Sequence, residues 1–195
     1  MIKKRILLLA GASAAGKTTV AKKIVSAGPR YCLVRSATTR PPRGDGNDAE
    51  YLYMSRGEFL SSLERGGFLE HTEFGSHLYG TPAFEIEDIF EKGSVPILIL
   101  DLNGIEALRA DARYEAFAVY LYADSATLER RLWDRISMGE GTEDEKRRQF
   151  DIRLERAKEY ERLAKEKASL FDAFISTEGK AASGTAEQIL SLFEE

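Results

Sequence analysis

The sequence predicts an α/β fold in which helices cover both faces of a mainly parallel central sheet. Short apolar runs alternate with longer segments of helical pattern along the chain, and this alternation is typical of a doubly wound sheet. The runs are almost continuously apolar, as strands buried on both faces are. The composition agrees, because 43% hydrophobic and 31% charged residues in a chain of 195 are the proportions of an ordinary globular protein.

Each element is predicted from the local pattern. The five predicted strands are residues 6–9, 31–34, 95–100, 117–121 and 174–175. The six predicted helices are residues 17–27, 82–91, 105–111, 125–136, 142–168 and 185–193. Thr142 and Glu145 form a capping-box pattern at the start of the longest helix, while Gly28 with Pro29, and Gly93, are stop signals for two others.

Composition also excludes several classes of protein. The net charge of −4 and the pI near 5.5 give no overall attraction to nucleic acid or to an anionic membrane. The apolar run at residues 6–9 follows basic residues like a secretory signal, but it is shorter than the roughly 7–15 apolar residues of such a signal. The single cysteine, Cys32, cannot form an internal disulfide or a cysteine-rich metal site. We therefore expect a cytoplasmic protein with no nucleic-acid or membrane partner.

Two stretches interrupt the alternation of strands and helices. Residues 36–81 are rich in Arg, Gly, Asp, Glu and Tyr, which indicates a small polar subdomain inserted between strands. The charged stretch that ends at Arg153 surrounds Gly139 and Gly141, as expected of a mobile flap between two helices. We predict one domain over residues 1–195, with a core of 1–35, 82–130 and 154–195, an insert at 36–81 and a lid at 131–153.

A phosphate-binding loop follows the first predicted strand. Residues 11–18 match G-x-x-x-x-G-K-[ST] in the strand-to-helix setting that this motif requires, whereas a plain glycine-rich turn is the less specific alternative. The glycines let backbone N–H groups converge on phosphate oxygens at a helix N-terminus. Lys17 can reach the β- and γ-phosphates, and the Thr18 hydroxyl can bind Mg²⁺. The predicted triphosphate-binding residues are Gly11, Ala12, Ser13, Ala14, Ala15, Gly16, Lys17, Thr18 and Thr19.

The insert carries a second group of candidate residues. Arg40 and Arg43, with Tyr51 and Tyr79, suit an anionic ligand, because guanidinium groups bind phosphate bidentately and phenols donate further hydrogen bonds. Glu70 is an acceptor when ionised and would pair with a donor-rich edge such as that of guanine. The alternatives are solvated loop arginines and half-buried core tyrosines. Asp101 ends a buried strand as a Walker B aspartate does, although a turn residue or helix N-cap gives the same pattern.

At these residues the sequence resembles guanylate kinases, the enzymes that move a phosphate from ATP to GMP. The matching motifs are the P-loop, S-x-T-T-R-x-P-R at residues 36–43, F-L-E at 68–70, Y-G-T at 79–81, paired arginines at 131 and 135, and R-L-x-x-A at 153–157. The resemblance implies a P-loop doubly wound sandwich in which the insert binds GMP. Asn103 stands where the family usually has a second Asp, and Ser176 with Thr177 stand where it commonly has Asn-Asp near the adenine.

The resemblance also implies roles for particular residues. The GMP-binding residues would be Ser36, Arg40, Arg43, Tyr51, Glu70, Tyr79, Thr81, Asp101 and Asn103. The catalytic residues would be Lys17, Arg131, Arg135 and Arg153, with Mg²⁺ bound at Thr18 as the cofactor. The expected small-molecule partners are ATP and GMP, and the pattern gives no oligomeric state. The remaining candidates, His71, His77, Cys32 and Trp133, form no catalytic or metal-binding group and are assigned to structure.

The reaction expected from the resemblance is ATP + GMP → ADP + GDP. It needs no general base, because a phosphate monoester with a second pKa near 6 is mostly a dianion at pH 7. Two alternatives stay open: a kinase of another small phosphorylated acceptor, such as ribose 1,5-bisphosphate, and a non-enzymatic guanylate-kinase-like binding module. Glu70 and the paired arginines at 40 and 43 favour GMP over the first. The intact Lys17 and Thr18 favour an enzyme over the second.

Overall fold

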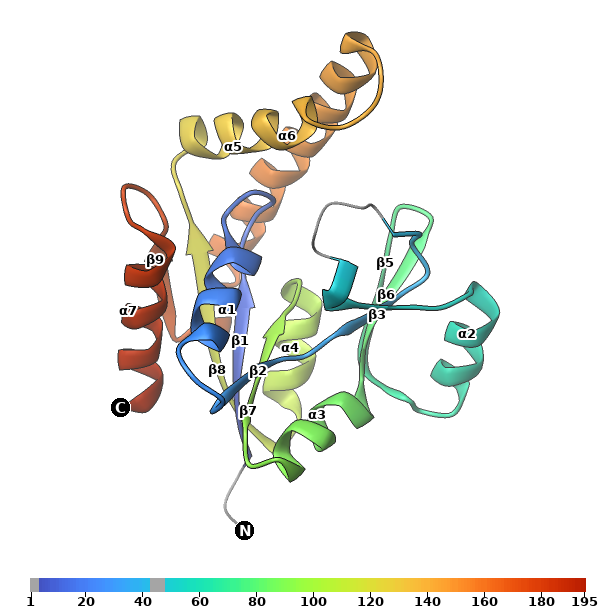
Figure 1. The fold of residues 1–195 in the computed structure, drawn as a ribbon, viewed down its shortest axis with the longest axis vertical. Coiled ribbons are helices and arrows are strands. Elements are labelled where there is room, and N and C mark those ends of the chain that lie inside the picture. Colours follow the sequence, from blue (N-terminus) through green and yellow to red (C-terminus); the bar gives the residue numbers. More distant parts are fainter. Residues whose placement is uncertain (1–3, 43–47) are drawn as a thin grey trace. The chain divides into compact units, whose positions relative to one another are not determined.

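The computed structural model describes residues 4–42 and 48–195 (Figure 1). This part of the chain forms two compact units, each described by itself below. Of the described residues, the first unit contains 4–8, 25–42 and 48–117, and the second contains 9–24 and 118–195.

A central sheet carries the apolar runs of the sequence. Its described strands are, in spatial order, β2 (Tyr31–Leu33), β7 (Val95–Ile99), β1 (Lys4–Ala10), β8 (Tyr114–Tyr122) and β9 (Ala173–Ser176). β2 pairs with β7 in parallel, and β8 pairs with β9 in parallel. Residues 6–9 of β1 have no exposed surface, which explains why this run is continuously apolar. The predicted α/β fold with a mainly parallel central sheet is confirmed.

In the first unit, α3 (Ala83–Glu91) contacts β7, and α4 (Leu102–Ala110) begins soon after β7 ends. Asp101 is the N-cap of α4, because its Oδ1 accepts a hydrogen bond of 2.8 Å from the backbone N–H of Gly104. This cap starts α4 at Leu102, three residues before the predicted start.

A second, mixed sheet lies between β2 and α3 in the chain of the first unit. Its described strands are, in spatial order, β4 (Tyr51–Tyr53), β3 (Ser36–Thr38), β6 (His77–Pro82) and β5 (Phe68–Phe74), with η1 (Asp48–Glu50) and α2 (Arg56–Glu64) as connections. β3 and β4 are parallel, whereas β6 is antiparallel to β3 and β5. The sequence predicted only a polar subdomain here, because these strands are short and one face of the sheet is polar.

The other face of this second sheet is apolar. Ala37 and Leu78 form a buried cluster with Phe59 of α2, and Phe68 stacks on Phe59 with ring centroids 4.4 Å apart. Gly80 lies beneath these rings, since a Cβ there would come within 3.1 Å of the Phe59 ring and 3.0 Å of the Phe68 ring. The apolar face therefore anchors α2 and leaves the opposite face for polar side chains.

The helices of the second unit follow the predicted pattern closely. They are α1 (Lys17–Ser26), α5 (Ser125–Ser137), α6 (Glu143–Glu166), the short η2 (Ala168–Leu170) and α7 (Ala182–Glu194). The capping box of α6 is confirmed, with Thr142 and Glu145 each bonding the backbone N–H of the other. The N-cap of α7, Ala181, makes no side-chain cap, so the sequence lacks a start signal and α7 begins three residues before its predicted start. No helix in the described ranges is both long and apolar enough to cross a membrane.

Helices α5 and α6 contain most of the residues predicted to form a lid. Trp133 of α5 meets Phe150 of α6 edge to face, with ring centroids 5.5 Å apart, and the Arg147 guanidinium lies 5.5 Å from the Trp133 ring centroid. Trp133 thus packs between the two helices, as expected of a structural residue. The predicted flap is helical except for residues 138–142.

Candidate functional site

The loop between β1 and α1 has the backbone shape of a phosphate-binding loop. Gly11, Ala14 and Gly16 have φ angles of 152°, 67° and 90°. Gly11 is required by a close approach, because a Cβ there would lie 2.3 Å from the carbonyl oxygen of Leu121 on β8. Ala14 is the sole non-glycine residue with positive φ among those described, and holding an L-residue there stores backbone strain.

Lys17 is folded back over this loop. Its Nζ donates hydrogen bonds to the carbonyl oxygens of Gly11 at 2.7 Å and Ala12 at 3.0 Å. Burial, and then the positive charge of Arg135, lower the pKa of Lys17 to about 8. The ammonium group is therefore held at the loop between β1 and α1, in an environment where an incoming anion would stabilise its charge.

Thr18 offers an oxygen donor beside Lys17. It lies half-buried in the first turn of α1, where its hydroxyl is a hard ligand of the kind Mg²⁺ accepts. No group of three or more His, Cys, Asp or Glu side chains that could hold a metal occurs in the described part of the chain. This donor set fits an ion bound mainly by substrate phosphates and water, with one protein ligand, rather than an ion in a protein cage.

Arg131 of α5 reaches the same loop. Its Nη1 donates to Thr177 Oγ1 at 3.0 Å, and its Nη2 donates to the Thr177 carbonyl oxygen at 2.9 Å. A Cβ on Gly16 would lie 4.0 Å from both Arg131 Nη1 and Thr177 Cγ2, so this pair lies beside the second glycine of the loop. Sequence reasoning noted Thr177 only as a departure from the family pattern and missed its contact with Arg131.

The other two predicted arginines of the second unit are Arg135 and Arg153. Arg135 is exposed on α5, near enough to Lys17 for its charge to act on the lysine. Arg153 is half-buried on α6, and its expected contact with a phosphoryl group stays a prediction. The second unit thus gathers Lys17, Thr18 and Arg131 around one loop, with Arg135 within electrostatic range.

Strand register places the predicted acceptor residues on the polar face of the second sheet. Thr38 pairs with Tyr79 across β3 and β6, and with Tyr53 across β3 and β4. Because directly paired residues project to the same face, the hydroxyl groups of all three side chains share that face. Ser36 and Tyr51, two residues earlier in β3 and β4, face the same way.

A β-bulge brings Glu70 to the polar face. β5 pairs Phe68 with Pro82 but Glu70 with Thr81, so one extra residue separates the two pairs. Without this shift, Phe68 and Glu70 would project to the same face of the sheet. The bulge instead lets Phe68 join the apolar cluster while Glu70 Oε1 accepts a hydrogen bond of 2.6 Å from Thr81 Oγ1.

The Glu70 carboxylate lies at the start of α4. A Cβ on Gly104 would come within 3.2 Å of Glu70 Oε2. The pKa of Glu70 is raised overall, mainly by burial and also by the negative charge of Asp101. The hydrogen bond from Thr81 opposes this rise. Asp101 is close enough to act on Glu70, yet its Oδ1 caps α4, which is the N-cap alternative left open by the sequence. Asn103 is exposed in the first turn of α4.

Arg40 is a buried cation flanked by aromatic rings. It is 7% exposed, and its Nη1 donates to the Pro41 carbonyl oxygen at 2.7 Å. Its guanidinium carbon lies 5.1 Å from the Tyr51 ring centroid and 5.8 Å from the Tyr53 ring centroid. Sequence reasoning missed Tyr53, whose hydroxyl donates to Asp48 Oδ1 at 2.5 Å. The alternation Tyr-Leu-Tyr at residues 51–53 could have identified it, because both tyrosines fall on one face of a strand.

A cavity of about 400 Å³ opens beside Arg40 and Tyr79. Its lining residues are Arg40, Pro41, Pro42, Phe74, Gly75, Ser76, His77 and Tyr79. His77, which the sequence assigned to structure, thus lines this cavity. Arg43 lies outside the described residues. The structure therefore brings Arg40 and Tyr79 to one cavity, and it brings Glu70, Thr81 and Asp101 together near the start of α4.

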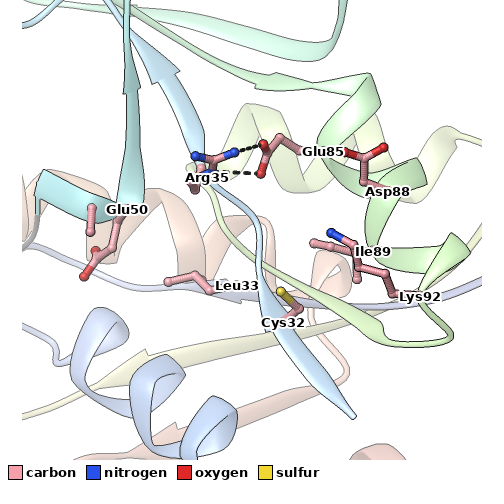
Figure 2. A pocket seen from close by; sticks show the side chains of 9 residues that line it. Cys32, Leu33, Arg35, Glu50, Glu85, Asp88, Ile89 and Lys92 are labelled. Carbon is pink, nitrogen blue, oxygen red and sulfur yellow. Dashed lines mark hydrogen bonds and ion pairs between the residues drawn. The ribbon is translucent and has the colours of Figure 1, made fainter. Parts of the chain in front are cut away.

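A second cavity of the first unit, about 360 Å³ in volume, contains none of the predicted site residues (Figure 2). Arg35 and Glu85 form a two-armed ion pair beside it, with Arg35 Nη2 2.5 Å from Glu85 Oε1 and Arg35 Nε 3.2 Å from Glu85 Oε2. Arg35 lies between β2 and β3, and Glu85 lies in the first turn of α3. The pair thus joins the two points where the chain enters and leaves the second sheet.

Comparison with known proteins gives a consistent result. The guanylate kinase family model matches residues 3–179. A guanylate kinase of Rubrobacter xylanophilus is 37% identical over 144 residues, covering 72% of this chain and 74% of that protein. A guanylate kinase of Prochlorococcus marinus is 35% identical over 172 residues, covering 87% of each chain.

The comparison of structures supports the fold. The crystal structure of guanylate kinase from Anaplasma phagocytophilum superimposes with a TM-score of 0.72, covering 100% of this chain and 86% of that one. The sequence identity of this pair is 23%, so the match concerns the architecture alone. A shikimate kinase from Acinetobacter baumannii has a TM-score of 0.50 at 16% identity, so its similarity to this chain also concerns the fold alone.

Proposed function

The chain belongs to the guanylate kinase family, and from this premise we propose that it transfers the γ-phosphoryl group of ATP to GMP, giving ADP and GDP. The observation that carries the choice of acceptor is the position of Glu70. Its carboxylate is partly buried beside Thr81, on the sheet face that also holds Tyr79. An ionised carboxylate accepts hydrogen bonds from guanine N1–H and the exocyclic amine, whereas adenine presents a lone pair at N1.

The acceptor phosphate would bind in the cavity beside Arg40. The buried guanidinium supplies a fixed positive charge, and Tyr79 adds a phenolic donor on the same cavity wall. We include Arg43, Ser36, Tyr51 and Asp101 in the acceptor site as predictions from the family pattern. Because the GMP phosphate is already a dianion at pH 7, the residues need to orient it rather than remove a proton from it.

The donor triphosphate would bind at the loop formed by residues 11–19. Backbone N–H groups and Lys17 would hold the phosphates, while Arg131, Arg135 and Arg153 would stabilise charge on the migrating phosphoryl group. Mg²⁺ would be bound with ATP by Thr18, where it neutralises phosphate charge. Exclusion of water by the α5–α6 region would limit hydrolysis of ATP.

Two other functions were compatible with the sequence. Ribose 1,5-bisphosphate has no base edge with N–H donors for the acceptor-only carboxylate of Glu70, which lies beside Thr81. A non-enzymatic binding module does not need the lysine of the phosphate-binding loop, whereas here two carbonyl oxygens hold Lys17 at that loop. Both observations favour the guanylate kinase reaction. We include a cytoplasmic location as a prediction, because a chain with a single cysteine does not need an oxidising compartment to form an internal disulfide.

The test is a coupled assay of ADP release with ATP, Mg²⁺ and one acceptor at a time. The acceptors are GMP, AMP, CMP, UMP and ribose 1,5-bisphosphate. We expect kcat/KM to be highest for GMP by at least 100-fold. A higher value for any other acceptor, or no release of ADP with any of them, would contradict the proposed function.

A further inference from the structure

Thr177 holds the guanidinium group of Arg131 at two points. The side-chain hydroxyl and the backbone carbonyl each accept one hydrogen bond, at 3.0 Å and 2.9 Å. Thr177 is itself 5% exposed and firmly attached, because its N–H donates to the Tyr122 carbonyl oxygen at 2.8 Å and its Oγ1 lies 3.2 Å from the same oxygen. Tyr122 is the last residue of β8, and it pairs with Ser176, the last residue of β9 and the neighbour of Thr177 in the chain. Through Thr177, the arginine is thus attached to the carboxyl end of β8.

We propose that Thr177 is a positioning residue that holds Arg131 beside Gly16 for stabilisation of the transferring phosphoryl group. The inference rests on the proposed function and adds a residue to it. A guanidinium group has five N–H donors, and Thr177 uses two of them, so three stay available for phosphate oxygens. Fixing the long side chain before substrate binds removes part of the entropy cost of ordering it later.

The experiment measures kcat and both KM values for Thr177→Val, alone and in an Arg131→Ala background. Thr177→Val keeps the shape and the backbone carbonyl but removes the hydroxyl. We expect it to lower kcat about tenfold, the smaller end of the cost of a hydrogen bond to a charged group, with both KM values within threefold of wild type. In the Arg131→Ala background the same substitution should change kcat by less than twofold. A merely structural role would lower kcat by similar factors in both backgrounds, and that result overturns the proposal, as does unchanged kcat in the single variant.

A further variant tests the hydroxyl directly. Thr177→Ser keeps the group that accepts the hydrogen bond from Arg131 and should keep most of the wild-type kcat. A kcat in Thr177→Ser as low as that of Thr177→Val would overturn the proposal. If Thr177→Val does not fold, as judged by thermal unfolding, Thr177→Ala takes its place in both backgrounds.

A matched control and the wild type complete the design. Thr185→Val removes a buried hydroxyl of α7 that has no hydrogen-bond partner among the described residues, and it should leave kcat unchanged. A wild-type protein that releases no ADP with GMP would overturn the proposed function and the inference together. If the wild type is active but Thr177→Val lowers kcat by the same factor with and without Arg131→Ala, the inference alone is overturned.

Discussion

The surroundings of Lys17 favour the binding of an anion beside its ammonium group. Its ammonium group is bound by two loop carbonyls, but burial and the charge of Arg135 lower its pKa to about 8. Bound phosphate would oppose both effects and raise the pKa again. Binding of ATP and protonation of Lys17 are therefore linked.

We predict that the titration of Lys17 leaves ATP affinity unchanged below pH 8 and lowers it by up to tenfold per pH unit above pH 8, because the deprotonated lysine must regain a proton when ATP binds. Calorimetry at pH 9 in two buffers of different ionisation enthalpy should show proton uptake. The unfolded lysine has a pKa near 10.5, so between pH 8 and 10.5 the unfolded state binds more protons and this group's contribution to stability rises with pH. In Lys17→Met, persistence of the proton uptake would assign it to another group.

Glu70 gives the sharpest test of acceptor choice. We predict that Glu70→Ala lowers kcat/KM for GMP by about 10- to 150-fold, the cost of one charged hydrogen bond or more, with little effect on the KM for ATP. The ratio of GMP to AMP activity should fall with it. Glu73→Ala, on the exposed part of the same strand, is the control and should leave the ratio unchanged. An unchanged ratio in Glu70→Ala would mean that this residue does not recognise the base.

At the scale of elements, the second sheet depends on close packing beneath β6. A Cβ at Gly80 would lie 3.0–3.1 Å from the Phe68 ring, the Phe59 ring and the Glu70 carbonyl oxygen. The last contact is with the backbone next to the bulge that turns Glu70 toward Thr81. Packing on the apolar face and the position of Glu70 on the polar face are therefore coupled through β6.

We predict that Gly80→Ala costs about 1–3 kcal/mol of stability by overpacking and raises the KM for GMP more than the KM for ATP. Thermal unfolding and steady-state kinetics measure the two effects. Gly57→Ala is the matched control, because a Cβ at Gly57 in α2 meets nothing within 4 Å and alanine favours a helix. Wild-type stability in Gly80→Ala would show that the rings and β5 relax without cost.

At the scale of the whole molecule, the residues assigned to the two substrates come from different compact units. Lys17, Thr18 and Arg131 belong to the second unit, whereas Arg40 and Glu70 belong to the first. The sequence order does not follow this division, since residues 9–24 join the second unit and the next stretch joins the first. Substitutions in the second unit should therefore weaken binding of ATP more than binding of GMP, and substitutions in the first unit should do the reverse.

We predict opposite patterns for Lys17→Ala and Arg40→Ala. Arg40→Ala should weaken GMP binding about 10- to 150-fold and ATP binding less than threefold, since it removes a charged hydrogen-bond donor from the acceptor cavity. Lys17→Ala should abolish turnover while GMP still binds. Calorimetric titration with each nucleotide measures binding, and the assay of ADP release measures turnover. The control is Arg65→Ala, which removes an exposed arginine of the first unit that does not line the acceptor cavity. Equal loss of both nucleotides in Arg40→Ala would contradict its assignment.

The sequence by itself determined the parts of this protein that depend on neighbours in the chain. The P-loop is one contiguous motif, and the central strands are continuous apolar runs, so both could be predicted from spacing and hydropathy. The capping box of α6 and the family resemblance rest on patterns of the same kind. Local backbone geometry is set within a few residues, and a pattern of that length records it.

Only the tertiary structure decided which distant residues meet. The bulge that separates Phe68 from Glu70 is a property of the pairing between β5 and β6, and a one-residue slip changes the face of every later side chain. The contact of Arg131 with Thr177 joins residues 46 positions apart. Such contacts depend on register and packing between elements, which the order of residues along one strand or helix does not encode.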